Sequence, residues 1–132
     1  MSAVVLDTSA VLAWLREEAG WQRVDAVIHD GDCRMSTVNW AELVAKLSER
    51  MSSAEDIDRL LSDIPVLRIP FDEAQARLSG QLRPLTRALG LSLGDRACIA
   101  LALQHGLPVL SADRAWAQLE IGIPVELIRN NS

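Results

Sequence analysis

The fold is decided near the N-terminus by Ala3-Val4-Val5-Leu6-Asp7-Thr8-Ser9, a short apolar run that ends at an aspartate. The apolar, β-branched character of Ala3–Leu6 predicts a buried strand. The polar residues that follow are typical of a helix start, so we predict a helix over Ser9–Glu18. The sequence therefore predicts a strand that leads directly into a helix, with a carboxylate at the junction.

The rest of the chain repeats this alternation. Further strands are predicted over Asp32–Ser36, Val66–Ile69, Pro108–Leu110 and Val125–Ile128. Further helices are predicted from Gly20 to near Gly31 and over Thr37–Met51, Ser53–Ser62, Asp72–Leu89 (with Pro84 as a point of interruption), Ala97–Leu103 and Arg114–Leu119. This alternation predicts an α/β fold whose parallel sheet is covered on both faces. We expect one domain over residues 1–132, since this length can bury a substantial core.

Composition limits the class of protein. A hydrophobic content of 49% and a charged content of 23% are ordinary for a soluble globular protein. The sequence has no apolar run of membrane-spanning length and no secretion signal, so we expect a cytoplasmic protein without membrane contact. Cys33 and Cys98 match no zinc or redox spacing and are expected to be buried thiols. The net charge of −5 alone argues against a nucleic-acid binder, although clustered carboxylates would supply much of it.

Four carboxylates stand at strand ends or helix starts: Asp7, Glu42, Asp95 and Asp113. In right-handed crossovers each helix begins at the carboxyl edge of the preceding strand, and ligands bind at that edge. Topology therefore brings the four side chains to the same edge of the sheet. Carboxylates packed together have raised pKa values and cost stability unless a cation binds. Oxygen ligands of this kind suit Mg²⁺ or Mn²⁺.

Each of these carboxylates also has an ordinary structural explanation. Asp7 and Asp113 are favourable helix N-caps. Asp95 follows Ser92 at the spacing of a capping box. Glu42 lies off the apolar stripe of its helix, as a solvent-exposed glutamate would, so periodicity does not orient it toward a site.

The sequence resembles a known family in four segments: Val4–Ala10, Asn39–Leu43, Leu93–Ala102 and Gly106–Trp116. These are similar to the successive motifs of PIN-domain ribonucleases, and most of all to those of the VapC toxins of bacterial toxin–antitoxin pairs. The likeness runs from Ala3 to the final strand, although Ser111 stands where the family commonly has threonine. Ser52–Leu89 carries no motif, so substrate choice could be set there.

The resemblance implies a PIN-like three-layer fold, in which helices flank a mostly parallel five-stranded sheet of order 3-2-1-4-5. It implies an Mg²⁺- or Mn²⁺-dependent endoribonuclease, in which a metal-activated water attacks a phosphodiester of RNA. The implied catalytic and metal-holding residues are Asp7, Glu42, Asp95 and Asp113. The resemblance also implies a homodimeric toxin that a cognate VapB-type antitoxin inhibits.

Neighbours of the four carboxylates are candidates for supporting roles. Thr8, Ser9 and Ser111 carry hydroxyls that could hold a carboxylate or a water, or could serve only in local capping. Arg96 and Arg114 each follow a proposed ligand directly, so they either contact RNA phosphate or balance the acids.

Other residues receive weaker assignments. His29 and His105 have no partner that sequence can identify, so neither is assigned to catalysis. We expect the helices around Trp14, Trp21 and Leu60 to receive the antitoxin, because aromatic residues are common interface anchors. Core packing is the ordinary alternative for a tryptophan.

Other classes of protein fit less well. An aspartyl phosphatase would need a second aspartate where Ser9 stands. A receiver-type signalling module would need an acidic pair near the first strand and a late lysine, but Lys46 is the only lysine. A nucleotide-binding fold would carry a glycine-rich phosphate loop, which is absent from the sequence. An interaction domain without activity is disfavoured because all four carboxylates are retained.

Overall fold

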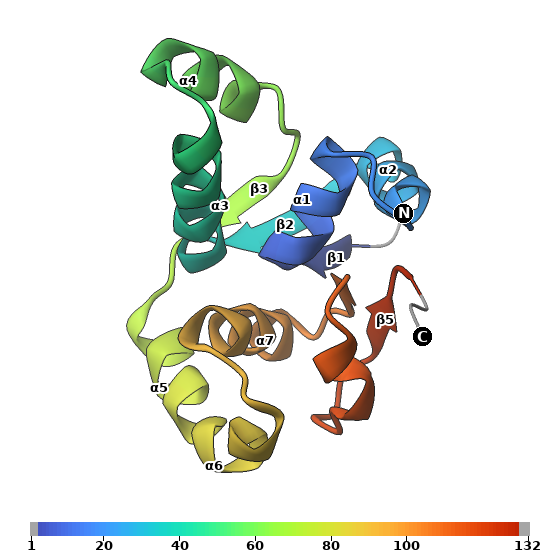
Figure 1. Ribbon diagram of the computed structural model, residues 1–132. Coiled ribbons are helices and arrows are strands. Elements are labelled where there is room, and N and C mark those ends of the chain that lie inside the picture. Colours follow the sequence, from blue (N-terminus) through green and yellow to red (C-terminus); the bar gives the residue numbers. More distant parts are fainter. Residues whose placement is uncertain (1–2, 130–132) are drawn as a thin grey trace.

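The computed structural model describes residues 3–129 and consists of a parallel sheet between two layers of helices (Figure 1). The strands are β1 (Ala3–Leu6), β2 (Asp32–Ser36), β3 (Leu67–Ile69), β4 (Val109–Ser111) and β5 (Val125–Leu127). The helices are α1 (Thr8–Leu15), α2 (Trp21–Asp30), α3 (Thr37–Arg50), α4 (Ala54–Ser62), α5 (Glu73–Gln81), α6 (Arg83–Thr86) and α7 (Leu93–His105), with 3₁₀ turns η1 (Arg87–Leu89) and η2 (Arg114–Gln118).

The strand order is β3-β2-β1-β4-β5, and all four neighbouring pairs are parallel. This confirms the predicted α/β class and the 3-2-1-4-5 order. It also excludes the receiver-type module, because that doubly wound sheet has the order 2-1-3-4-5. Among the helices of residues 3–129, none has the length and apolar character that a membrane span needs.

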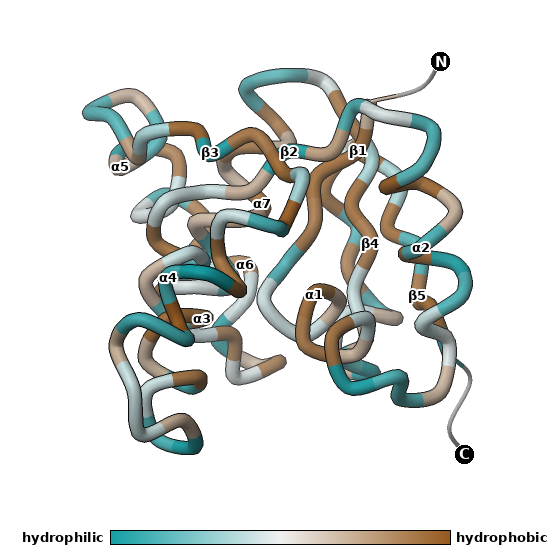
Figure 2. The backbone as a smooth tube through the Cα atoms, turned by 90° about the horizontal axis from the view of Figure 1, so that it is seen from above, coloured by the Kyte–Doolittle hydropathy of each residue, from teal (hydrophilic) through white to brown (hydrophobic). Residues whose placement is uncertain are grey.

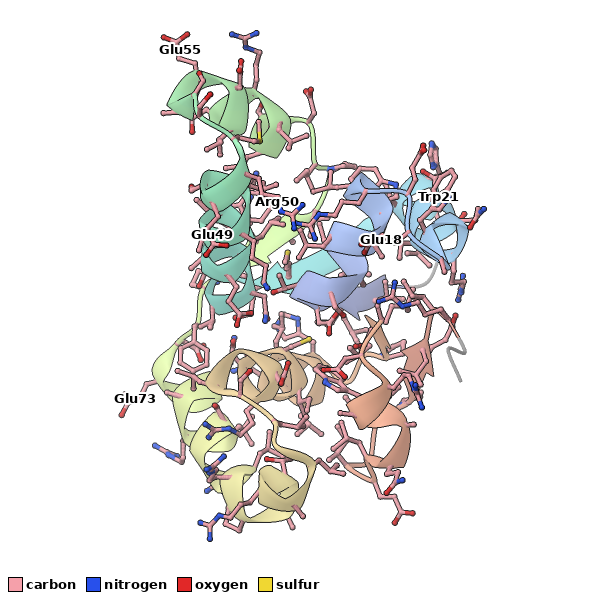
Figure 3. The ribbon with its side chains drawn as sticks, in the orientation of Figure 1. Glu18, Trp21, Glu49, Arg50, Glu55 and Glu73 are labelled. Atoms are coloured by element: carbon pink, nitrogen blue, oxygen red, sulfur yellow. The ribbon has the colours of Figure 1, made fainter. Side chains whose placement is uncertain are left out.

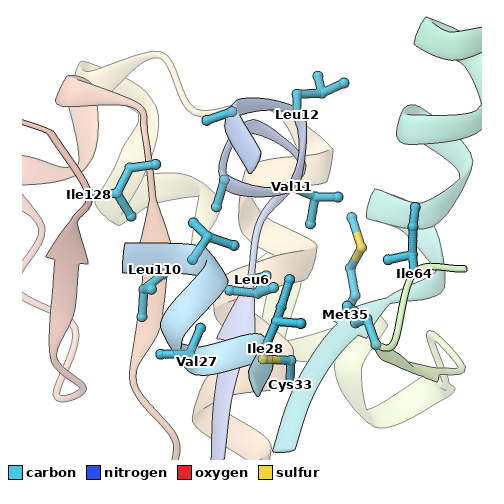
Figure 4. Close-up of a cluster of buried hydrophobic side chains, with 14 of the residues drawn as sticks. Leu6, Val11, Leu12, Val27, Ile28, Cys33, Met35, Ile64, Leu110 and Ile128 are labelled. Atoms are coloured by element: carbon cyan, nitrogen blue, oxygen red, sulfur yellow. The ribbon is translucent and has the colours of Figure 1, made fainter. Parts of the chain in front are cut away.

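Side chains of the central strand alternate between two hydrophobic clusters, as the pleat of a strand requires. Val4 and Leu6 face one cluster, in which residues of α1, α2 and α3 cover the sheet (Figure 4). Val5 faces the other cluster, which is built largely on α7. The tube through β1 and β4 is accordingly hydrophobic along its length (Figure 2). Burial on both faces explains why Ala3–Leu6 is apolar throughout rather than alternating.

Several helix boundaries differ from the predicted ones. Helix α7 begins at Leu93 rather than Ala97, because a capping box between Ser92 and Asp95 starts it earlier. The helix predicted over residues 72–89 is divided into α5, α6 and η1. Pro84 lies in the first turn of α6, where its missing N–H costs no helical bond, although it cannot continue α5.

The sheet order sets the position of the candidate site. The chain leaves β1 toward β2 on one side and reaches β4 on the other, so the strand order reverses between β1 and β4. The backbone N–H of Asp7 donates to the carbonyl of Leu110 at 3.3 Å, which joins the carboxyl ends of these two strands. Ligands of open α/β sheets bind at such a reversal point.

Candidate active site

Asp7 lies at the end of β1 and caps α1, with only 3% of its surface exposed. Its Oδ1 accepts the backbone N–H of Ala10 at 2.9 Å. Ser9 Oγ lies 2.8 Å and 2.9 Å from its two oxygens, and Ser111 Oγ donates to Oδ2 at 2.7 Å. The carboxylate is thus both the predicted helix cap and the centre of a buried polar cluster.

Two backbone amides orient the serine hydroxyls toward Asp7. The N–H of Ala112 donates to Ser9 Oγ at 2.9 Å, and the N–H of Asp113 donates to Ser111 Oγ at 3.0 Å. Because each hydroxyl oxygen already accepts a hydrogen bond from a backbone N–H, its own single proton is free to point at the carboxylate. The loop after β4 therefore fixes the orientation of Asp7.

Glu42 is held in the pocket by residues of three helices. Its Oε1 accepts from Thr8 Oγ1 at 2.8 Å and from Asn39 Nδ2 at 3.0 Å. The same Asn39 amide donates to the carbonyl of Gly94 at 3.0 Å. A methyl group placed on Gly94 would lie 2.2 Å from Glu42 Oε2, so the carboxylate rests against the α carbon of this glycine. The structure thus orients Glu42, which helical periodicity could not do.

Asp95 and Asp113 use one oxygen each as a cap. Asp95 Oδ2 accepts the N–H of Ser92 at 2.9 Å, and Asp113 Oδ1 accepts the N–H of Ala115 at 2.9 Å. In the hydrogen bonds of the described residues, the second oxygen of each carboxylate is unused. Capping therefore orients the two groups without exhausting their capacity to bind a ligand.

The four carboxylates line one pocket of about 210 Å³. The remaining lining residues are Thr8, Ser9, Leu12, Asn39 and Lys46. Burial raises the pKa of Asp7 from 3.8 to about 6, even though hydrogen bonds from Ser111, Ala10 and Ser9 oppose the rise. Burial also raises the pKa of Asp95, and the charges of Asp113 and Glu42 add to this. The acids are therefore close enough to repel one another, which favours binding of a cation.

Most of the chain's other acidic side chains are unrelated to this pocket. Glu49, Glu55 and Glu73 are exposed at the periphery of the molecule (Figure 3). The pocket contains four of the 18 acidic residues of the sequence. The acidic character of the pocket therefore comes from four carboxylates that line it together.

A family model for the PIN domain matches residues 4–122. The chain belongs to the PIN domain family. No curated protein sequence matches it. The predicted family is therefore confirmed over most of the chain.

Solved structures with the same fold include a structure described as a toxin–antitoxin complex. VapBC from Salmonella typhimurium, crystallised with DNA, has a TM-score of 0.75 at 18% identity over 98% of this chain and 100% of that chain. FitAcB from Neisseria gonorrhoeae has a TM-score of 0.65 at 25% identity, over 92% of this chain and 95% of that chain. VapC20 from Mycobacterium tuberculosis, described as a toxin that cleaves the sarcin-ricin loop, has a TM-score of 0.69 at 14% identity over 92% and 99%.

The donor set of this PIN domain fits a hard divalent cation, because the acidic lining offers only oxygen ligands. Within residues 3–129, however, no three His, Cys, Asp or Glu side chains are arranged so that they could together hold an ion. Mg²⁺ commonly binds through one or two carboxylates and keeps several waters. The open arrangement therefore suits a partly hydrated ion better than an ion enclosed by protein atoms.

The predicted supporting residues have different outcomes. Thr8 and Ser9 line the pocket, and Ser111 bonds directly to Asp7. Arg96 is half-buried, and its Nη1 donates to the Ser79 carbonyl of α5 at 3.2 Å, so its contact with RNA stays a prediction. Each residue of a helix is rotated by about 100° from the one before it, so Arg96 and Asp95 leave α7 in different directions. Arg114 is exposed at the start of η2 and stays a candidate.

The tryptophans proposed for antitoxin binding are partly buried. Trp14 packs against the core cluster of α1 and α2, and its Nε1 donates to Asp25 at 3.0 Å. Leu60 packs against the same cluster. Trp21 is half-buried at the start of α2, where Figure 3 labels it. Core packing thus explains part of the burial of Trp14 and Leu60.

Sequence reasoning missed three residues of the pocket region. Asn39 and Gly94 lie inside the family-like segments but have no role that the sequence indicates, and Lys46 stands out in the sequence only as the single lysine. Asn39 is 1% exposed although it is polar, which marks it as part of a specific hydrogen-bonded network. Its position three residues before Glu42, on the same side of the helix, was the signal that could have found it.

Proposed function

We propose that this PIN domain is the toxin of a toxin–antitoxin pair and acts as an Mg²⁺- or Mn²⁺-dependent endoribonuclease in the cytoplasm. The observation that carries the proposal is the convergence of Asp7, Glu42, Asp95 and Asp113 on one pocket. The toxin–antitoxin complexes with the same fold support the partner, and the RNA-cleaving activity attributed to VapC20 supports the substrate class.

Asp7, Glu42, Asp95 and Asp113 would hold the ion directly or through waters. When bound, the ion supplies an activated water and offsets the negative charge of the phosphoryl oxygens. Ser9 and Ser111 keep Asp7 oriented by donating to it, and Thr8 and Asn39 do the same for Glu42. Such supporting hydrogen bonds are commonly worth a factor of 10 to 100 in metal affinity or activity.

The protein would bind a VapB-type antitoxin at the helices around Trp14, Trp21 and Leu60, and would act as a homodimer. Arg114, which is exposed at the start of η2, would contact RNA phosphate. The RNA that is cut would be identified by sequencing the RNA ends that arise during controlled expression, with Asp7→Asn as the inactive comparison.

The test is an RNA-cleavage assay with purified protein in Mg²⁺ or Mn²⁺. We expect cleavage by the wild type, loss of cleavage on addition of EDTA, and loss of cleavage in Asp7→Asn. Asp58→Asn, which removes an exposed carboxylate of α4, is the matched control and should cleave normally. Cleavage that survives EDTA, or that Asp7→Asn retains in full, would contradict the proposal.

A further inference from the structure

The pocket contains one residue of opposite charge, Lys46, which is also the only lysine of the chain. It lies on α3 four residues after Glu42, so the two side chains share one face of the helix. Four residues correspond to about 6 Å along the helix axis. Lys46 therefore lies on the same pocket wall as Glu42, one turn farther along α3.

The opposite wall of the pocket, on α1, also has a lining residue one helical turn beyond the acidic cluster. Leu12 lines the pocket from α1, four residues after Thr8. The hydrogen bond from Thr8 to Glu42 joins α1 to α3. Leu12 lies one helical turn beyond Thr8, and Lys46 lies one turn beyond Glu42. The acidic cluster therefore opens into a short groove between α1 and α3, with an apolar residue on one side and an ammonium group on the other.

The charge of Lys46 is not neutralised within the described residues. Their ion pairs involve Arg23, His29, Arg34, Arg59 and Arg129, and none involves Lys46. Glu42 is its natural partner at this spacing. The carboxylate of Glu42, however, is turned to Thr8, Asn39 and Gly94. The exposed ammonium is consequently available to an anion that enters the groove.

We propose that Lys46 binds a phosphate of the RNA strand at the mouth of the pocket. The inference rests on the proposed ribonuclease function and names a contact of that substrate. Four carboxylates and one divalent ion leave the pocket negative, so an entering phosphodiester is repelled unless another cation offsets the charge. A lysine ammonium supplies three donors and one positive charge without demanding a particular geometry. Arg50, labelled in Figure 3, continues this face of α3 by a further turn.

The test measures RNA affinity as a function of salt in the uncleaving Asp7→Asn background. The probe is a fluorescein-labelled single-stranded RNA oligonucleotide in Mg²⁺, and fluorescence anisotropy follows its binding. We expect Lys46→Gln to weaken binding about tenfold at low salt. The slope of log K against log salt should become shallower by about 0.7, the value for one lost phosphate contact on a single strand. Lys46→Arg keeps the positive charge and should therefore retain most of the wild-type RNA affinity and salt slope.

Arg59→Gln is the control for net charge, because it removes one cation from exposed α4, away from the pocket lining. It should leave the salt slope unchanged. If Lys46→Gln matches this control in affinity and slope, the proposal is overturned. If Lys46→Gln only tightens Mn²⁺ binding measured by calorimetry, Lys46 is a counter-charge to the acids and the proposal is likewise overturned.

Steady-state cleavage kinetics separate a wrong role for Lys46 from a wrong ribonuclease function. In wild-type background, Lys46→Gln should raise KM with kcat nearly unchanged, since it removes a contact made equally in the ground and transition states. Cleavage by the wild type with an unchanged KM in Lys46→Gln overturns the role of Lys46 alone. Absence of cleavage by the wild type in either metal overturns both.

Discussion

Gly94→Ala should impair the site while leaving the fold almost intact. The new methyl would lie 2.2 Å from Glu42 Oε2 and 2.6 Å from Oε1, whereas ordinary contact begins near 3.4 Å. The carboxylate must therefore move by about 1.2 Å. Its bonds to Thr8 at 2.8 Å and Asn39 at 3.0 Å cannot both survive that displacement.

The energetic cost to folding should nevertheless be small. Glu42 is only half-buried, so its displaced carboxylate can regain hydrogen bonds from water in the pocket. Gly94 does not have a positive φ, so alanine fits its backbone and contributes about 0.4–1 kcal/mol through the unfolded state. We expect the free energy of unfolding to stay within about 1 kcal/mol of wild type, while metal affinity and cleavage fall by about 10- to 100-fold.

Gly80→Ala is the matched control, because Gly80 is also helical and a methyl there would meet nothing within 4 Å. It should be as stable as wild type or slightly more stable, with unchanged cleavage. The assays are urea denaturation, Mn²⁺ calorimetry and RNA cleavage on all three proteins. If Gly94→Ala has the metal affinity and cleavage rate of Gly80→Ala, the position of the Glu42 carboxylate does not matter for metal binding or cleavage.

Three further predictions concern Asp7, Ser111 and Trp21. In metal-free buffer, the pKa of about 6 for Asp7, against 3.8 unperturbed, means that the native state binds this proton more tightly than the unfolded state. Stability should therefore fall as pH rises from about 4 to 6, by up to about 3 kcal/mol, and Asp7→Asn should remove this fall in urea denaturation. Equal pH dependence in both proteins would contradict the burial argument. Ser111→Ala removes a hydrogen bond that lowers the pKa of Asp7. The pH at which Mn²⁺ affinity falls on acidification should therefore rise. An unchanged pH dependence of Mn²⁺ affinity would count against a role of Ser111 in holding the Asp7 carboxylate. Trp21→Ala should weaken antitoxin binding measured by calorimetry, whereas unchanged affinity would exclude Trp21 from that interface.

Three of the four carboxylates could be located from sequence because their positions depend on topology. Asp7, Asp95 and Asp113 follow strands or begin a helix, and parallel crossovers bring such positions to one edge. Asp7 and Asp113 are N-caps and Asp95 is the N3 residue of a capping box, so the structural and the ligand-binding explanations hold together rather than compete. A hydrogen bond to the helix start fixes the orientation of a carboxylate, which is an advantage for a residue that must also meet a ligand.

Glu42 could not be placed from its own helix. Its surroundings are supplied by Thr8 and Gly94, which are 34 and 52 residues away in the sequence. Helical periodicity describes which face of a helix is apolar, but not which polar residue lies over a neighbouring helix. Arg96 shows the same limit, since its hydrogen bond to the Ser79 carbonyl of α5 joins residues that are distant in the sequence.

The most direct test of the central claim is anomalous diffraction from a crystal soaked in Mn²⁺. We expect a peak in the pocket, within about 2.1 Å of a carboxylate oxygen of Asp7, Glu42, Asp95 or Asp113, with waters completing the shell. The matched Asp7→Asn crystal should show a weaker peak or none. A protein that cleaves RNA in Mn²⁺ while its only anomalous peaks lie outside this pocket would contradict the account.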